Sequence, residues 1–209
     1  MRFIDVAMIA ANTDRSKAYL QALLQHGIYP SFVIIMVEKR NQLLPGQSEN
    51  EKIESDNNVN GKVVLDIAYN PAESIENTLQ SSDIPFMLIP QTDINCDEVI
   101  KAISSRDESV FIYSGYGGQI LKKKVLDIGK LFLHVHGGYL PDYKGSTTNY
   151  YSLILDNECG ASSLFLNEKI DSGRILIRRK YPPPENKKQI DYIFDPIIRA
   201  KVLVETLQY

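Results

Sequence analysis

An unbroken apolar run limits the folds open to this chain. Residues 32–37, FVIIMV, are apolar without exception and rich in β-branched side chains. A strand with one face in water would alternate apolar and polar residues, so this run predicts a strand buried on both faces. Such strands are typical of parallel sheets covered by helices.

Strand and helix patterns alternate on both sides of this run. Residues 3–10 are apolar except for Asp5, and the apolar residues between 19 and 24 recur at helical spacing. Residues 62–69 are predicted to be a strand or an extended segment, and 84–90 and 130–136 are predicted strands. Residues 109–118 are predicted to be a strand that leads into a glycine-rich turn, and helices are predicted at 71–79, 96–104 and 120–129. This order predicts an α/β fold with a Rossmann-like, doubly wound, mostly parallel sheet.

The pattern changes after Pro141. Residues 147–155 are predicted to be helical, and 162–168 and 173–181 are predicted strands that can pair as a hairpin beside the main sheet. An amphipathic helix over 191–208 closes the chain. We expect one catalytic domain over residues 1–209, with a polar, flexible insertion around 41–62, where the sequence is rich in Asn, Ser and Glu.

Charge and composition exclude several classes of partner. The net charge of -3 gives no electrostatic attraction to nucleic acid or to an anionic membrane, so a small molecule is the expected ligand. Cys96 and Cys159 are far apart and show no metal-ligand spacing. With neither a signal peptide nor a long apolar segment in the sequence, we expect a cytoplasmic protein.

Two histidines lie one residue apart where the apolar run 130–136 ends. Because side chains alternate along a strand, His134 and His136 point to one face, and Leu133 and Val135 point to the other. The two glycines that follow leave room for a ligand to approach. Since ligands of doubly wound sheets bind at the carboxyl ends of strands, both rings are candidates to act on the same molecule.

Metal binding is an alternative use of this pair, because imidazole is a common zinc ligand. The third histidine, His26, lies at the predicted end of the first helix, where the helix dipole accounts for it. Asp142 or Asp171 would have to complete a ligand set. Spacing by itself leaves metal binding and proton transfer open, and we predict no metal site.

Asp171 is the candidate carboxylate for orienting a basic histidine. It lies in the sequence IDSG between the two late strands. A carboxylate beside an imidazole selects its tautomer and stabilises the imidazolium. The alternative, an aspartate that only shapes a turn, stays open at this stage.

The stretch HVHGGYLPDYKG, followed by IDSGRIL, resembles the signature of the folate-dependent formyltransferases. This family includes glycinamide ribonucleotide, methionyl-tRNA and sugar N-formyltransferases. Its pattern is Asn-x-His-Pro-Ser-x-Leu-Pro, then Tyr-Lys/Arg-Gly, and later Asp-x-Gly-x-Ile. The residues in step with it are His136, Leu140, Pro141, Tyr143, Lys144, Gly145, Asp171, Gly173 and Ile175. The resemblance covers most of the chain, and the closing segment is more similar to the sugar-modifying members.

The resemblance implies transfer of a formyl group from N10-formyltetrahydrofolate to a primary amine. His136 would then assist proton transfer from the amine, and Asp171 would hold that histidine or a water molecule. His134 stands where the family has an asparagine that donates an N–H to the formyl oxygen, a role that a neutral imidazole can fill with its one donor. The Pro-Ser of the pattern is replaced by Gly137 and Gly138, which leave more room.

The segment SVFIYSGYGGQIL resembles the strand and loop that hold the folate pterin in this family. The implied donor-binding residues are Tyr116, Gly117, Gly118, Gln119, Ile120 and Leu121.

The resemblance to the sugar-modifying members implies that the acceptor is a nucleotide-linked amino sugar, of the pseudaminic-acid type. Its candidate contacts are Lys144, Ser146, Thr147 and Asn149, although these residues equally suit a polar turn that caps the next helix.

Two other function classes remain open. One is a non-catalytic folate- or nucleotide-binding domain, and the other is a metal-dependent hydrolase built on the histidine pair. A dinucleotide oxidoreductase is disfavoured, because no GxGxxG turn follows the first strand. A homodimer through the closing helix or the late strands is a further expectation.

Overall fold

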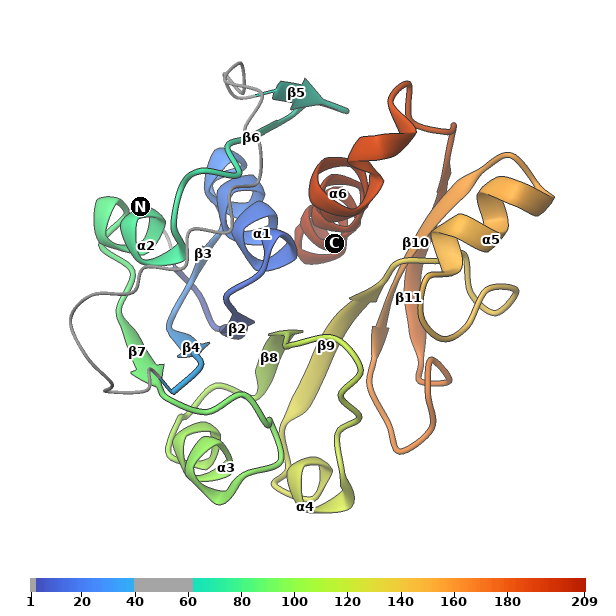
Figure 1. The fold of residues 1–209 in the computed structure, drawn as a ribbon. Coiled ribbons are helices and arrows are strands. Elements are labelled where there is room, and N and C mark those ends of the chain that lie inside the picture. Colours follow the sequence, from blue (N-terminus) through green and yellow to red (C-terminus); the bar gives the residue numbers. More distant parts are fainter. Residues whose placement is uncertain (1–2, 40–61) are drawn as a thin grey trace.

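The computed structural model describes residues 3–39 and 62–209 and contains a seven-stranded sheet with helices on both faces (Figure 1). The sheet has the order β11-β10-β9-β8-β2-β4-β7. Its strands are β2 Ala7–Ala11, β4 Val33–Met36, β7 Phe86–Ile89, β8 Val110–Ser114, β9 Leu131–His136, β10 Cys159–Phe165 and β11 Ile175–Tyr181. The five neighbouring strands β9, β8, β2, β4 and β7 are parallel. Strand β10 pairs antiparallel with both β9 and β11, and this mostly parallel sheet confirms the predicted fold class. The predicted insertion at 41–62 lies outside the described residues, apart from Lys62.

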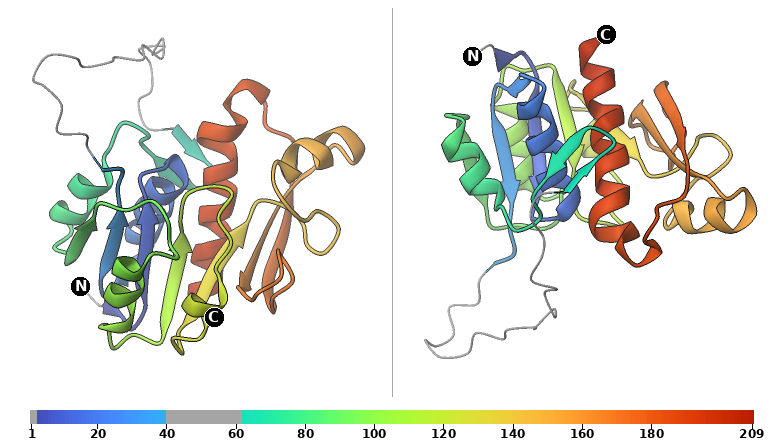
Figure 2. Two further views of the ribbon diagram at one scale, coloured as in Figure 1. Left: turned by 60° about the horizontal axis from the view of Figure 1, so that its bottom comes forward. Right: turned by 90° about the horizontal axis from the view of Figure 1, so that it is seen from above.

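Two helical layers cover the sheet (Figures 1 and 2). One face carries α1 Asp14–Gln25, α2 Ile75–Ser81 and α6 Asp195–Gln208, and the other carries α3 Asp97–Ser104 and α4 Lys123–Leu126. Helix α5, Thr148–Leu155, packs beside β10. A 3₁₀ turn, Lys187–Gln189, and a π-helical turn, Ile190–Phe194, lead into α6.

Strand β4 shows why the apolar run predicted a covered parallel sheet. Its four residues are all fully buried. Val33 and Ile35 join the core beneath α1 and α6, whereas Ile34 and Met36 join the core beneath α3 and α4. Burial on both faces is therefore confirmed, and it leaves no room for the polar alternation of a half-exposed strand.

Several predicted boundaries differ from the structure. Residues 3–10 form two strands, because β1 (Phe3–Ile4) pairs with β3 (Tyr29–Pro30) and β2 joins the main sheet. Residues 62–69 form a hairpin of β5 (Lys62–Val64) and β6 (Ile67–Tyr69). Helix α2 begins only at Ile75, where the Ser74 side chain accepts a hydrogen bond from the Asn77 amide at 3.1 Å.

The hairpin between β5 and β6 depends on the backbone of its two-residue turn. Leu65 and Asp66 both have positive φ, at 53° and 66°. Two consecutive left-handed residues produce a turn whose twist suits a two-residue hairpin. Neither residue is a glycine or an asparagine, so the usual turn signal was missing from the sequence.

The late hairpin extends the main sheet instead of lying beside it. Strand β10 pairs with β9 in the register Ser162↔His136 to Phe165↔Leu133, and β11 pairs with β10. The connection after Phe165 therefore starts level with Leu133. It must fold back along β9 for any of its residues to reach the carboxyl end of that strand.

A buried ion pair connects the amino ends of β4 and β8, far from the carboxyl ends where ligands are expected. Glu108 is 3% exposed and pairs with the Arg106 guanidinium at 2.7 Å. It also accepts a hydrogen bond from the Ser31 hydroxyl at 2.6 Å. The Arg106 guanidinium lies 4.1 Å from the centroid of the Phe32 ring. These contacts hold the two segments that precede β4 and β8 together.

The Glu108 ion pair predicts a pH-dependent stability. The hydrogen bond from Arg106 is the main reason that the pKa of Glu108 falls from 4.5 to about 2. Because the folded-state pKa is depressed, this stabilisation is complete above pH 4.5 and is lost as the pH falls towards 2. We expect Glu108→Gln to lower the free energy of unfolding at neutral pH by roughly 2–3 kcal/mol, as measured by urea denaturation.

The matched control is Glu185→Gln, at an exposed glutamate. The difference between Glu108→Gln and the wild type should shrink as the pH is lowered. A difference that stays constant down to the acid end would contradict this assignment.

Candidate active site

A cavity of about 560 Å³ opens beside the carboxyl ends of β8 and β9. Its walls come from α1, the loop after β8, β9, the loop before α5, the β10–β11 connection and α6. The polar and reactive side chains that line it belong to Arg15, Tyr113, Tyr116, Gln119, His134, His136, Ser146, Thr147, Thr148, Asn167, Lys169, Asp171 and Arg199. A more open groove of about 700 Å³ runs along β11, and none of the predicted catalytic residues line it.

Both strand histidines line the cavity, on the face that their spacing predicted. Leu133 and Val135 point into the core beneath α6. His134 is partly buried, and its Nδ1 lies 3.0 Å from the Tyr113 carbonyl oxygen. Burial, with Arg15 acting in the same direction, lowers the pKa of His134 to about 3. This ring is therefore neutral at physiological pH.

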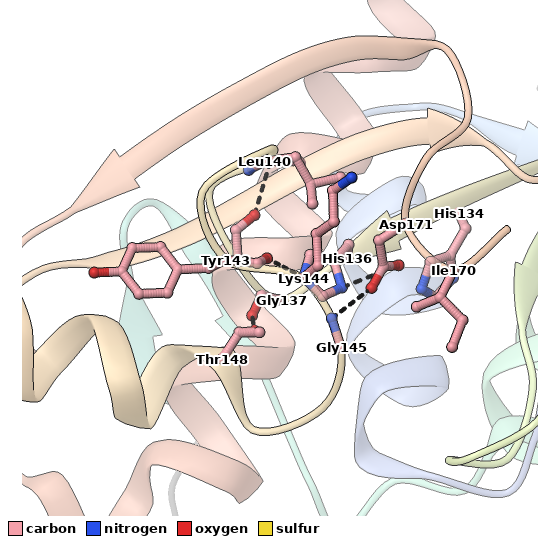
Figure 3. Close-up of polar contacts among 12 residues, drawn as sticks. His134, His136, Gly137, Leu140, Tyr143, Lys144, Gly145, Thr148, Ile170 and Asp171 are labelled. Carbon is pink, nitrogen blue, oxygen red and sulfur yellow. Dashed lines mark hydrogen bonds and ion pairs between the residues drawn. The ribbon is translucent and has the colours of Figure 1, made fainter.

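His136 lies between two acceptor groups (Figure 3). Its Nε2 is 2.8 Å from the Tyr143 carbonyl oxygen, and its Nδ1 is 3.4 Å from Asp171 Oδ1. Burial lowers the pKa of His136 below its ordinary value of 6.5, while Asp171 and the Tyr143 carbonyl oppose that shift. A carbonyl oxygen only accepts hydrogen bonds, so Nε2 carries a hydrogen and Nδ1 is the nitrogen that can gain or lose one.

Asp171 reaches His136 because the β10–β11 connection folds back towards the end of β9. Its Oδ2 accepts a hydrogen bond from the Gly145 amide at 2.8 Å, and its side chain is 11% exposed. Its φ is 47°, a conformation that costs free energy in a residue other than glycine and that the surrounding contacts must hold. The carboxylate is thus oriented by the backbone of the loop before α5 while it contacts the imidazole.

The two glycines after His136 are needed for close packing. A Cβ on Gly137 would collide with the Arg199 guanidinium. A Cβ on Gly138 would lie 2.7 Å from His136 Nε2 and 2.8 Å from the Thr148 hydroxyl. The extra room that the glycines were expected to leave for a ligand is therefore occupied by protein atoms. Arg199 fills the space over Gly137.

The loop after β8 forms one wall of the cavity, and all six predicted donor-binding residues line it. The amide side chains of Gln119 and Asn95 hold this loop through hydrogen bonds. Gln119 Oε1 accepts a hydrogen bond from the Ile94 amide at 3.0 Å, and Asn95 donates to the Ile120 carbonyl at 3.1 Å. Among the residues that the structure describes, none other than their chain neighbours lies within 4 Å of the Cβ positions of Gly117 and Gly118, and both glycines are exposed.

Two of the four predicted acceptor contacts line the cavity, and the other two do not. Ser146 and Thr147 line the cavity, and Thr147 has a left-handed φ of 56° where α5 begins. Lys144 does not line the cavity and lies 3.4 Å from the Ser172 hydroxyl. Asn149 is 4% exposed, donates to Asp195 at 2.8 Å and accepts from the Gly160 amide at 2.7 Å. Both ends of the Asn149 amide are therefore used inside the protein.

Sequence reasoning missed two arginines that line the cavity, Arg15 and Arg199. Arg199 forms an ion pair with Asp195 at 2.9 Å. Arg15 donates to the Ser114 hydroxyl at 3.1 Å and to the Gly115 carbonyl oxygen, and no carboxylate of the described residues pairs with it. Arg15 lies in the first turn of α1, just after the carboxyl end of β2, and this position could have marked it in the sequence as a cavity residue. Arg199 lies within the closing helix, where its position in the sequence gives no such indication.

The described residues contain neither a cluster of metal ligands nor a membrane-spanning helix. No group of three or more histidine, cysteine, aspartate or glutamate side chains in 3–39 and 62–209 is placed to hold a metal ion. In the same ranges every helix is too short or too polar to cross a membrane.

Comparison with known proteins adds the family. The model of the formyl transferase family matches residues 6–189. A methionyl-tRNA formyltransferase of Desulfotalea psychrophila is 29% identical over 125 residues, which are 58% of this chain and 38% of that protein. One from a Synechococcus strain is 32% identical over 113 residues, 53% of this chain and 35% of that protein. The chain thus spans well under half the length of these curated relatives.

Solved structures share the fold. A phosphoribosylglycinamide formyltransferase from Streptococcus pneumoniae superposes with a TM-score of 0.62 at 13% identity, covering 97% of this chain and 96% of that one. A sugar N-formyltransferase from a Shewanella species gives a TM-score of 0.56 at 15% identity, covering 97% and 68%. Members of the family take their formyl group from N10-formyltetrahydrofolate. Since the family match includes β9, both histidines and the Asp171 turn, this chain belongs to the formyl transferase family.

Proposed function

We propose that this protein transfers a formyl group from N10-formyltetrahydrofolate to the primary amine of an amino sugar, and that the sugar is linked to a nucleotide. The observation that carries the proposal is the contact of 3.4 Å between His136 and Asp171 beside a cavity lined by the loop 116–121. Family membership supports formyl transfer, and the likeness to the Shewanella sugar N-formyltransferase supports the choice of sugar.

The loop 116–121 is the part of the cavity that suits the donor. Gly117 and Gly118 are exposed, and the loop is braced by the hydrogen bonds between Gln119 and the Ile94 amide and between Asn95 and the Ile120 carbonyl. A pterin ring carries several donors and acceptors in one plane, and a braced loop backbone can match them without the entropy cost of ordering long side chains. When bound, the folate supplies an activated formyl group, and the protein orients it.

His136 handles the proton in this proposal. Because its Nε2 is bound to the Tyr143 carbonyl, a proton taken from the attacking amine resides on Nδ1. Asp171 then faces the imidazolium through Oδ1 and is itself held by the Gly145 amide. A positioned base of this kind typically contributes about 10²–10⁴-fold to the rate.

Two cations support an anionic acceptor. Arg15 and Arg199 line the same cavity, and only Arg199 has a carboxylate partner within the described part of the chain. Burial and the neighbouring Arg199 lower the pKa of Arg15, so an anion beside this guanidinium would favour its charged form. A diphosphate between a sugar and a nucleoside would compensate this charge with charge-assisted hydrogen bonds.

The proposal predicts a mass change in the acceptor. After incubation with N10-formyltetrahydrofolate and a panel of UDP- and dTDP-linked amino sugars, mass spectrometry should find one sugar in which a formyl group replaces a hydrogen. We expect His136→Gln and Asp171→Asn to reduce that rate by about 10²–10⁴-fold. The first variant removes the imidazole that takes the proton, and the second removes the carboxylate that faces the imidazolium.

His26→Gln is the matched control, since His26 caps α1 outside the cavity and its ring Nδ1 lies 2.8 Å from the Ala22 carbonyl oxygen. It should keep wild-type activity. Folate binding without formylation of any amine in the panel would favour the non-catalytic alternative. Turnover that requires added zinc, with no folate, would favour the hydrolase.

The pH profile should follow His136. Because burial lowers its pKa below 6.5, kcat/KM should stay on its plateau at pH 6.5 and fall only in more acidic buffer. Asp171 raises the pKa of His136, so this pKa should be lower in Asp171→Asn. The acidic limb of the residual activity of this variant should therefore lie at lower pH than in the wild type. An acidic limb that moves to higher pH in this variant would contradict the assignment.

Arg15 should contribute to acceptor affinity. We expect Arg15→Gln to raise the KM of the nucleotide-linked sugar by about tenfold to a hundredfold while the donor KM changes little, because charge-assisted hydrogen bonds to phosphate are lost. Lys17→Gln is the control, since Lys17 pairs with Asp14 on the same helix and does not line the cavity. An equal KM increase for the free amino sugar would argue against a diphosphate contact.

A further inference from the structure

The tautomer of His134 is determined by a main-chain carbonyl. The register between β8 and β9 runs as far as Ile112↔Leu133, and the carbonyl of the next residue, Tyr113, lies 3.0 Å from His134 Nδ1. Since a carbonyl oxygen can only accept, the hydrogen of this bond resides on Nδ1. The Tyr113 ring also packs against the imidazole, with centroids 5.9 Å apart, and this contact limits rotation of the ring.

The other ring nitrogen of His134 is left as a hydrogen-bond acceptor. A neutral imidazole carries one N–H, and in His134 that hydrogen is on Nδ1. The surroundings keep the ring neutral, because it is partly buried and shares its cavity with the cations Arg15 and Arg199. Nε2 therefore has a lone pair and no hydrogen.

This lone pair faces the cavity. Within residues 3–39 and 62–209, no protein group forms a hydrogen bond with His134 Nε2. His134 Nε2 is absent from the set of fully buried polar atoms without a partner, so it is accessible. His134 also lines the cavity. With no partner among the described residues, this nitrogen is placed to accept a hydrogen bond from a ligand or water.

The two histidines of β9 thus differ in what they present to a ligand. Both nitrogens of His136 have protein partners, the Tyr143 carbonyl and the Asp171 carboxylate. His134 has one nitrogen tied to the main chain and one free. Donation of an N–H to the formyl oxygen, which was expected of His134 by analogy with the family asparagine, would require the opposite tautomer.

We infer that His134 binds the acceptor amine by accepting one of its hydrogens at Nε2. This inference rests on the proposed function and adds a residue that contacts the nucleophile. With one N–H held by His134, the amine nitrogen keeps its lone pair free to be aimed at the formyl carbon. Orientation of this kind is a recognised source of rate enhancement.

The transfer forms one bond and breaks one. The amine nitrogen forms a bond to the formyl carbon, and the bond between that carbon and the donor nitrogen breaks. One amine hydrogen leaves as a proton through His136, and the departing donor nitrogen takes up a proton. The second amine hydrogen, the one held by His134, stays on the new amide. The negative charge that develops on the formyl oxygen is left to donors other than His134.

The first test reads the tautomer directly in the whole protein. Nitrogen-15 NMR of histidine-labelled protein should show three imidazoles, assigned with His26→Gln and His134→Gln. We expect His134 to be protonated on Nδ1 only, throughout the neutral pH range. Protonation of Nε2, or an imidazolium at neutral pH, would overturn the inference. This reading does not depend on any activity, so it stands even if formylation is never observed.

The second test uses two amides of different reach. The amide of asparagine occupies the position of an imidazole Nδ1, whereas that of glutamine reaches the position of Nε2. We expect His134→Asn to lower acceptor kcat/KM by about tenfold or more, with the donor KM changed less than about twofold, and His134→Gln to stay closer to the wild type.

An asparagine variant as active as the wild type would overturn the inference, because the family amide would then perform the same task. Thermal unfolding of both variants identifies any loss that comes from folding. If no acceptor is formylated even by the wild type, the proposed function fails while the tautomer measurement still decides whether Nε2 is an acceptor.

Discussion

Burial of Leu133 and Val135 beneath α6 is the constraint on which the site depends. Both side chains are within 2% of complete burial, and the period-two geometry of a strand then directs His134 and His136 to the opposite face. Neither histidine can turn away from the cavity unless β9 also exposes an apolar residue. The free energy of the hydrophobic core thereby holds the two imidazoles in place.

A connected set of polar contacts places the end of β9 against two helices. Asn149 on α5 bonds to Asp195, which pairs with Arg199 one turn further along α6. The Arg199 guanidinium covers Gly137, and the Thr148 hydroxyl donates to the Gly137 carbonyl oxygen. The residues that follow His136 are thus packed by α5 and α6, and the absence of side chains at the two glycines makes this contact possible.

Much of this arrangement was predictable from local pattern. The apolar runs located the sheet strands, because burial on both faces produces a composition that few other elements share. The alternation along 130–136 placed both histidines on one face. The resemblance of IDSGRIL to the family motif pointed to Asp171, and the structure brings that carboxylate to 3.4 Å from His136.

Other features depended on contacts between distant segments. The Leu65–Asp66 turn has no glycine, so only its backbone angles show the hairpin. Arg15 and Arg199 are 184 positions apart, and the packing of α1 against α6 brings them to one cavity. The antiparallel pairing of β10 with β9 starts the β10–β11 connection level with Leu133, and only the tertiary structure shows the fold-back that carries Asp171 to His136. Asn149 looks like a substrate contact in the sequence but is buried against Asp195 and Gly160.

The sequence by itself determined the α/β layers, the face of β9 that carries both histidines, and the family of the chain, because these depend on side-chain periodicity and on motif spacing. Only the tertiary structure decided which nitrogen of each imidazole carries the hydrogen. That choice depends on two main-chain carbonyls, those of Tyr113 and Tyr143, and every residue has a carbonyl whatever its side chain. Their positions are set by the packing of β8 and of the loop before α5, which no local pattern encodes.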